Sequence, residues 1–387
     1  MQETAGASWG ILVAICFARF AFGYQMQTVA SLGPDLVGLF GLSFAQLGSL
    51  VGAYMLPGIV AALACGFLAQ RFGDRAVLAT GMVLMTAGGA AAALAGGPGG
   101  IAAARILAGS GAVALTVMQG KVLADRFPGK LFLTTLGLML AGFPVGIGAG
   151  QMTQAPLAHR YGWRTAFLAG AVPAGIGAVV LLASWRGDPR GSVRRLSWPS
   201  PAECRLVILA GLMWTFYNAA FSAFLTYVPT LLAVRGTPLW VADLVMDAAT
   251  WGNVPALLLS GAAAARFGAG RVFLAGTAAA LIAIVCIGLL GWPLLWGVVF
   301  GTIGAVQAGI IVGAGTLSAR PGNRAVGMAL FYTTYYIGGT VFPALCGRAA
   351  DLVGDPSGAL LCGAALSALA VPCWYLHRRW ARRVPAG

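Results

Sequence analysis

The chain has 387 residues, of which 59% are hydrophobic and 9% are charged, against about a quarter charged in an ordinary soluble protein. So little charge cannot cover a water-facing surface, which excludes soluble enzymes, disulfide scaffolds and disordered chains. The net charge of +14 comes from basic residues scattered between long apolar runs, without a basic stripe, so we expect no nucleic-acid partner. The composition predicts an integral protein of the lipid bilayer.

Apolar runs close to the ~20 residues that cross a bilayer recur along the chain. Backbone groups in hydrocarbon must be satisfied within the chain, so runs of this length are helices. We therefore predict an all-α membrane protein with twelve transmembrane helices, at residues 11–32, 44–67, 77–95, 101–120, 131–150, 165–185, 207–230, 240–264, 272–290, 294–316, 327–345 and 358–376.

The basic residues are distributed unevenly over the connections between these spans. Most of them lie in alternate connections and at the C-terminal end, whereas the other connections hold only Arg160, Arg164, Arg235 and Arg348. Because Lys and Arg are enriched in cytoplasmic loops, this distribution predicts that both termini are cytoplasmic. The expected location is a bacterial-type inner membrane.

The longest connection, residues 186–205, divides the chain into two halves that look alike. The segment Gly66–Gly73 after span 2 recurs as Gly261–Gly268 after span 8. A Phe-x-Thr-Thr segment followed by Pro144 in span 5 recurs before Pro343 in span 11, at nearly the same separation. Repeats at one period indicate two six-helix units of one topology. We predict two pseudo-symmetric six-helix bundles, at residues 1–185 and 206–387, joined by a cytoplasmic loop at 186–205.

Three motifs carry a resemblance to a known family. The segment from Gly66 to Arg75 is similar to the loop 2-3 signature of the major facilitator superfamily, with Gln70 in place of its usual Asp. Arg105, four residues before Gly109-Ser-Gly111, resembles the span 4 signature, and Gly162-Trp163-Arg164 is also typical. The resemblance implies a secondary transporter that works by alternating access.

Two shorter stretches add a looser resemblance to the cyanate and nitroimidazole porter branch: Gly52-Ala-Tyr54-Met-Leu-Pro57-Gly58, and Lys121 with Asp125. Within the loop 2-3 signature, the basic residues are interpreted as a latch between helix ends. The predicted gating residues are Gly66, Arg71, Gly73, Asp74, Arg75 and, in the second half, Arg266. The alternative, that the basic residues only anchor the loop on the cytoplasmic side, stays open.

Charges inside the spans are the sharper evidence, because an Arg or Asp at the centre of a helix costs about 2.5 to 3.5 kcal/mol on insertion scales. Spans 1, 4 and 8 carry such residues: Arg19, Arg105, and Asp243 with Asp247. In the family's architecture spans 1, 4, 7 and 10 line a central cavity. The predicted substrate-binding residues are Arg19, Gln27, Arg105, Asn218, Gln307, Tyr332, Tyr335 and Tyr336, and Asp247 is the predicted proton-coupling residue.

A guanidinium in a dry cavity suits a carboxylate or another small anion. We therefore expect a monomeric proton symporter of a small organic or inorganic anion, without metal or cofactor. Two alternatives stay open: proton-coupled efflux of amphipathic compounds, and a non-transporting membrane sensor. Arg19 and Arg105 can also simply hold helices together, and the tyrosines can be ordinary helix packing. An enzyme is disfavoured because the only histidines, His159 and His377, lie outside the predicted spans.

Overall fold

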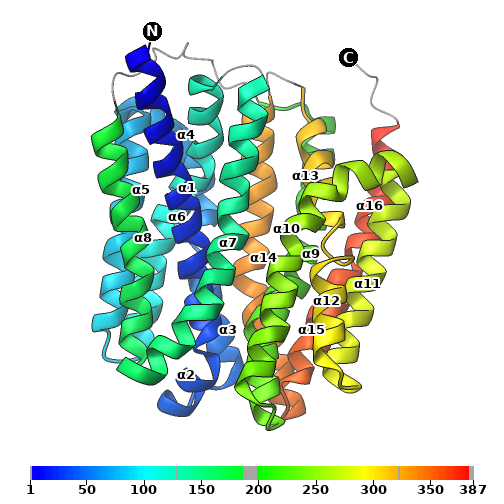
Figure 1. Ribbon diagram of the computed structural model, residues 1–387. Coiled ribbons are helices and arrows are strands. Elements are labelled where there is room, and N and C mark those ends of the chain that lie inside the picture. Colours follow the sequence, from blue (N-terminus) through cyan, green and yellow to red (C-terminus); the bar gives the residue numbers. More distant parts are fainter. Residues whose placement is uncertain (1, 128–129, 186–197, 321–322, 383–387) are drawn as a thin grey trace. The chain divides into compact units, whose positions relative to one another are not determined.

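The computed structural model describes residues 2–127, 130–185, 198–320 and 323–382 (Figure 1). Within these ranges the regular structure is entirely helical, which confirms the all-α prediction. The helices of the first half are α1 (Gln2–Ser31), α2 (Gly33–Phe40), α3 (Phe44–Ala53), α4 (Gly58–Phe72), α5 (Asp74–Leu94), α6 (Pro98–Arg126), α7 (Lys130–Tyr161) and α8 (Trp163–Ser184). Those of the second half are α9 (Pro201–Val234), α10 (Leu239–Phe267), α11 (Ala269–Leu289), α12 (Pro293–Gly301), α13 (Gln307–Leu317), α14 (Arg324–Val353), α15 (Ser357–Ala368) and α16 (Ala370–Ala381).

Each predicted span coincides with one helix or with a broken pair of helices. Eight helical segments of the described residues are long and apolar enough to cross a membrane by length and composition. Three other spans correspond to α7, α10 and α14, which have 32, 29 and 30 residues. The twelfth is the pair α12 and α13. The short helix α2, in the connection after span 1, is an element that the sequence analysis did not predict.

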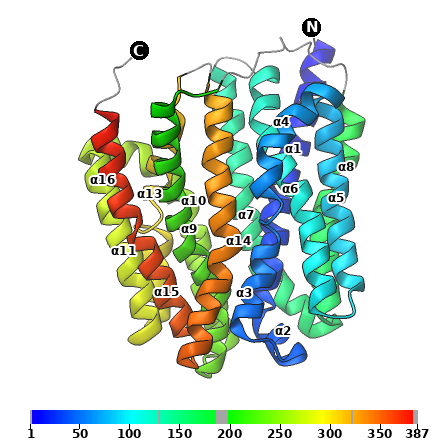
Figure 2. The same ribbon diagram turned by 180° about the vertical axis from the view of Figure 1, so that it is seen from behind.

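Prolines explain two of the three broken spans. A proline in a helix lacks the N–H that would bond the carbonyl four residues earlier, and its ring clashes with that carbonyl. Span 2 breaks between α3 and α4, and α3 ends at Ala53, four residues before Pro57. Span 12 breaks between α15 and α16, and α15 ends at Ala368, four residues before Pro372. Figure 2 shows α15 and α16 following one another closely despite this break.

Span 10 breaks without a proline, between α12 and α13. The turn at residues 302–306 lies where both neighbouring helices approach closely. A methyl group at Gly301 would overlap the backbone of Ala249 in α10, and one at Gly304 would lie 3.1 Å from the side chain of Ala280 in α11. Such close contact at glycines is typical of helix packing in membranes.

The repeated segments of the two halves share one local geometry. Gly73, between α4 and α5, has φ 83° and ψ 156°, and Gly268, between α10 and α11, has φ 86° and ψ 132°. In both halves the arginine two residues before this glycine lies over the ring of the phenylalanine that follows it in sequence. The Arg71 guanidinium is 5.4 Å from the Phe72 ring centroid, and that of Arg266 is 5.5 Å from the Phe267 centroid. The sequence repeat is therefore also a structural repeat.

The described residues divide into two compact units, and the division does not follow the chain order. The first unit holds α1 and α4 to α8, and the second holds Gly33–Gly52 with all helices from α9 onward. In the first unit α1 packs on α7 and α8, and α5 packs on α6 and α8. In the second, α9 packs on α13, α14, α15 and α16, and also on α2. The predicted two-bundle division at 186–205 assigned residues 33–52 to the first bundle, whereas their contacts lie with the second unit.

The helix α9 begins inside the segment predicted as the central loop, of which residues 186–197 lie outside the described residues. Ser200 and Glu203 form a reciprocal capping box at its N-terminus, and Pro201 occupies the first turn. These residues satisfy or remove backbone donors that a helix start leaves unpaired, so they extend the helix to Pro201. Glu203 also accepts hydrogen bonds from the Arg320 N–H (2.8 Å) and from Asn323 Nδ2 (3.1 Å), which joins α9 to the chain before α14.

The positive φ of Gly268 leads to a stability prediction. Gly268→Ala should lower the free energy of unfolding by about 1–3 kcal/mol, because an L side chain is strained in this backbone region although no atom lies within 4 Å of the added methyl group. Gly261→Ala is the matched control, since it also meets open space but lies in the regular helix α10. It should be neutral or stabilising by about 0.5–1 kcal/mol. Thermal unfolding of the purified protein measures both; equal midpoints for the two variants would contradict the strain at Gly268.

Candidate functional site

Arg19, on α1 in the first unit, is held by neutral groups of two other helices. Its Nη1 donates to Thr116 Oγ1 of α6 at 3.2 Å. The guanidinium lies 5.0 Å from the ring centroid of Phe143 in α7 and 5.3 Å from that of Phe22 in its own helix. The side chain is only partly buried. These contacts fix the guanidinium at mid-helix and leave part of the residue accessible.

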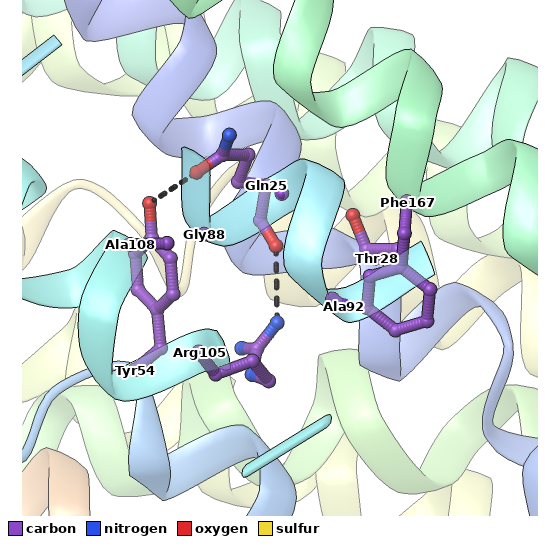
Figure 3. Close-up of a pocket in the computed structure, with 9 residues that line it drawn as sticks. Gln25, Thr28, Tyr54, Gly88, Ala92, Arg105, Ala108 and Phe167 are labelled. Carbon is purple, nitrogen blue, oxygen red and sulfur yellow. Dashed lines mark hydrogen bonds between the residues drawn. The ribbon is translucent and has the colours of Figure 1, made fainter. Parts of the chain in front are cut away.

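Arg105, on α6, is buried more deeply and is engaged by backbone. It is 3% exposed, and its two Nη atoms donate to the carbonyl oxygens of Gln25 (3.2 Å) and Met26 (3.4 Å) in α1. The guanidinium lies 4.9 Å from the ring centroid of Tyr54, whose hydroxyl donates to Gln25 Oε1 at 3.1 Å (Figure 3). Gln25 Nε2 in turn donates to the carbonyls of Met85 and Gly170.

The pocket beside Arg105 is small. It is lined by Gln25, Thr28, Gly88, Ala108 and Phe167, among others, and has room for about one water molecule (Figure 3). A pocket of that size does not admit an organic anion. The structure therefore favours the structural alternative for Arg105, which joins α6 to α1, over the predicted substrate contact.

Two predicted amides are likewise engaged within the helices. Gln307 is 1% exposed; its Oε1 accepts from Thr277 Oγ1 at 2.7 Å, and its Nε2 donates to the Gly304 carbonyl at 3.0 Å. Gln27 is 2% exposed and donates to Ser31 Oγ at 3.2 Å. These contacts favour a structural role for both, with Gln307 joining α13 to α11.

The predicted tyrosines of α14 meet a tryptophan that the sequence analysis missed. In the second unit, Trp214 of α9 lies 5.4 Å from Tyr217 and 6.2 Å from Tyr335, measured between ring centroids. Tyr336 lies 5.4 Å from Tyr335 and 6.5 Å from Tyr332. Tyr336 is buried, whereas Tyr332 and Tyr335 are half-buried. The predicted tyrosines of α14 thus form one side of an aromatic cluster that spans α9 and α14.

One buried polar atom of this cluster has no hydrogen-bond partner among the described residues. The Trp214 indole N–H is buried and has no acceptor among the described residues. Asn218, one turn later, donates from Nδ2 to the Trp214 carbonyl at 2.8 Å, and its Oδ1 is an acceptor by chemistry. A buried N–H group without an acceptor costs about 1–3 kcal/mol. A hydrogen-bond acceptor of a bound ligand is therefore favoured next to the Trp214 N–H.

Asp247 of α10 shows a similar feature in the second unit. The residue is half-buried, and its Oδ1 is buried without a hydrogen-bond partner among the described residues. Asp243, one turn earlier, is exposed. An acceptor in this state is a place where a proton or a donor can bind.

The start of α5 connects three helices of the first unit. Asp74 forms an ion pair with Lys121 of α6, with its two oxygens 2.6 and 2.8 Å from Nζ. Arg75 donates from Nη2 to the Leu182 carbonyl near the end of α8, at 3.2 Å. Among the predicted gating residues, Asp74 and Arg75 thus contact other helices of the first unit.

Two of the other predicted gating residues are placed by the backbone. Gly66 lies in α4, and Gly73 forms the turn that ends it. The side chains of Arg71 and Arg266 are exposed and lie over the rings that follow them in sequence. Lys121 was known from sequence only as part of a looser motif, and its pairing with Asp74 had no sequence signal.

Comparisons with known proteins agree with this architecture. A family model described as Major Facilitator Superfamily matches residues 15–343. A bacterial homologue of the human lysosomal transporter Spinster has a TM-score of 0.75 at 16% identity, covering 97% of both chains. The nucleoside transporter NupG also has a TM-score of 0.75, at 12% identity, covering 97% of this chain and 99% of its own. These likenesses confirm the predicted fold of twelve spans in two six-helix halves.

Several curated relatives are named as transporters of organic acids. A gallate transporter of Pseudomonas putida is 30% identical over 44% of this chain and 38% of its own length. A 4-hydroxybenzoate transporter of Pseudomonas aeruginosa is 27% identical over 47% and 40%. A 3-(3-hydroxy-phenyl)propionate transporter of Escherichia coli is 24% identical over 87% and 86%. The matches with the first two span about two fifths of those proteins. The looser resemblance to the cyanate and nitroimidazole porters is not confirmed.

The contacts of Arg105 predict a loss of stability on its removal. Arg105→Gln should lower the free energy of unfolding by about 2–3 kcal/mol, because hydrogen bonds from a buried charge to the α1 carbonyls are lost. Arg164→Gln is the control, since Arg164 is exposed and its guanidinium lies over the ring of Trp163; its change should stay within about 0.5 kcal/mol. Denaturation of the purified proteins measures both. Unchanged stability of Arg105→Gln would remove the structural role.

Proposed function

This chain belongs to the major facilitator superfamily, and we propose that it is a proton-coupled secondary transporter of a small organic anion, with hydroxylated aromatic acids as the substrate class. Membership of a superfamily of transporters agrees with the expectation that the chain is not an enzyme. The protein is a multi-pass membrane protein, and we place it in a bacterial inner membrane with both termini cytoplasmic.

The names of the relatives support this substrate class. Gallate, 4-hydroxybenzoate and 3-(3-hydroxy-phenyl)propionate each combine a carboxylate, an aromatic ring and at least one ring hydroxyl. A protein that binds such a molecule needs a cation for the carboxylate, apolar or aromatic surface for the ring, and a polar atom for the hydroxyl. The first unit offers a cation, and the second unit, considered by itself, offers aromatic surface and polar atoms.

Arg19 is the observation that carries the proposal. Its guanidinium is partly accessible and is held in place by the Thr116 hydroxyl and two rings, so it can present its fork of donors to a carboxylate. Arg105, by contrast, donates hydrogen bonds to two backbone carbonyls, and the pocket beside it has room for about one water molecule. We therefore assign the carboxylate to Arg19 and withdraw Arg105 from the substrate contacts.

The aromatic cluster of the second unit, considered by itself, offers groups of the kinds that bind a hydroxylated ring. Trp214 and Tyr335 offer aromatic faces, and aromatic pairs are stabilised beyond the area they bury. The Trp214 N–H and the Asn218 side chain offer a donor and an acceptor one turn apart. The same cluster would also suit the amphipathic compounds of the efflux alternative, so the carboxylate requirement is what separates the two functions.

Asp247 is the residue that we propose for proton coupling. Its buried oxygen without a hydrogen-bond partner can take up and release a proton as surrounding groups change. This assignment uses the same carboxylate that the sequence analysis chose, ahead of the more exposed Asp243.

The role of Arg19 is tested by uptake of a radiolabelled hydroxybenzoate. Arg19→Lys keeps the charge but loses the bidentate fork, so KM should rise roughly tenfold, equivalent to about 1.4 kcal/mol. Arg19→Gln should abolish saturable uptake. Thr116→Val is a matched variant that removes only the hydroxyl holding Arg19, and it should give an intermediate KM. If Arg19→Gln takes up substrate like the parent, Arg19 does not bind the substrate carboxylate, and efflux of amphipathic compounds becomes the favoured function.

The role of Asp247 is tested with purified protein reconstituted into lipid vesicles. Asp247→Asn preserves shape but cannot carry a proton, so uphill accumulation driven by a pH gradient should disappear while exchange of substrate across the membrane continues. Asp243→Asn, one turn away and exposed, should accumulate substrate like the parent. Gradient-driven accumulation by Asp247→Asn would show that another group carries the proton.

A further inference from the structure

Two cysteines meet where α14 and α15 form a helical hairpin. The helix α14 ends at Val353, Gly354 follows with φ 75°, and α15 begins at Ser357 and packs on α14. Cys346 lies eight residues before Gly354, and Cys362 lies eight residues after it. A hydrogen bond joins the two cysteine side chains. Both are free thiols, without a disulfide.

The packing of the hairpin explains why the two thiols face one another. A methyl group at Gly358 would lie 2.7 Å from the Ala349 carbonyl oxygen and 3.1 Å from the Ala350 Cα, so the two backbones are in contact there. Residues four apart lie on the same face of a helix. Cys362 is four residues after Gly358. Cys346 is four residues before Ala350, so both thiols lie on the contacting faces, one turn further from the hairpin's turn.

The two thiols differ in how accessible they are. Cys346 is 1% exposed, whereas Cys362 is half-buried. An S–H group that donates to a neighbouring sulfur stabilises the thiolate form of that neighbour, and the thiolate is the nucleophile in thiol chemistry. A small oxidant therefore reaches Cys362 first, and Cys346 is already in contact with the sulfur that reacts.

The hairpin lies at the ends of two predicted spans. Cys346 directly follows the span 327–345, and Cys362 is the fifth residue of the span 358–376. In the proposed orientation this end of both spans is periplasmic, where the surroundings are oxidising. We propose that Cys346 and Cys362 are a redox pair, which hydrogen peroxide converts into a disulfide that joins α14 to α15. This inference rests on the proposed function only through the orientation, and it uses no part of the substrate assignment.

The oxidation takes two steps. The Cys362 thiolate attacks one oxygen of hydrogen peroxide, so an S–O bond forms and the O–O bond breaks; the leaving hydroxide takes up the proton that the thiol released. Cys346 Sγ then attacks the sulfenic sulfur of Cys362. The S–S bond forms, the S–O bond breaks, and the Cys346 proton leaves with that oxygen as a second water. Each sulfur gives up one electron and the peroxide is reduced to two waters, so the step needs no other reactant.

The test counts the thiols that can be alkylated in the purified protein. The chain has seven cysteines, so the reduced and denatured protein should take up seven N-ethylmaleimide groups. After treatment with hydrogen peroxide the parent should take up five, and seven again after dithiothreitol. Trypsin cuts after Arg348, between the two cysteines, so a disulfide between them should link two tryptic peptides until the reductant separates them.

Two variants identify the cysteines involved. Cys362→Ser removes the accessible thiol, and its six remaining cysteines should all be alkylated after peroxide treatment. Cys373→Ser is the matched control, because Cys373 is buried and lies on the same tryptic peptide as Cys362. It should keep the pair and fall from six groups to four.

The proposal is overturned if the parent still takes up seven groups after peroxide, or if groups are lost without a linked peptide. It is also overturned if Cys362→Ser loses two groups as the parent does. Because the count needs neither a substrate nor a membrane potential, its result is independent of whether aromatic acids are transported.

Discussion

The need to satisfy backbone hydrogen bonds inside the bilayer is the constraint on which this structure depends. It makes the spans helical, and it also decides where they stop being regular. The α3 helix ends four residues before Pro57, and α15 ends four residues before Pro372, each at the carbonyl that the proline deprives of its partner. Six other prolines, among them Pro144 and Pro343, remain inside α7, α8, α9, α10 and α14. The carbonyl of Pro343 is one of the acceptors used by Tyr227, so irregular helix positions supply contacts between helices.

The two arginines inside the spans show how surroundings separate chemically identical side chains. Arg105 donates to two carbonyls of α1 and lies over the Tyr54 ring in a space that holds about one water molecule. Arg19 is held by a hydroxyl and by rings, and part of it remains accessible. The first arrangement uses the guanidinium to join helices, because its donors are already directed at fixed acceptors. The second keeps a positioned cation partly accessible, and for that reason we propose it for the substrate anion.

The sequence predicts what depends on composition and local pattern, and misses what depends on distant pairing. Twelve spans follow from apolar length, and the matching turns at Gly73 and Gly268 follow from the repeated segments. The Ser200–Glu203 capping box had a readable signal that the loop assignment overlooked. Trp214 gave no signal, because an aromatic residue in an apolar helix is ordinary until its neighbours are known. The pairing of Asp351 with Phe44 joins residues 307 positions apart and follows from no local pattern.

The two halves repeat one topology but do not repeat their charged contacts. Asp74, which pairs with Lys121, aligns through the Gly73–Gly268 repeat with Ala269, which has no charge. Asp351, which caps α3, aligns through the Pro144–Pro343 repeat with Met152, an exposed apolar residue. Backbone geometry is therefore kept by the repeat, because every helix must satisfy the same constraint, while charges at helix ends differ. Because halves of one topology are related by an axis along the membrane normal, exchanging them does not interchange the two sides of the membrane, so the unequal contacts distinguish the two halves and not the two transport states.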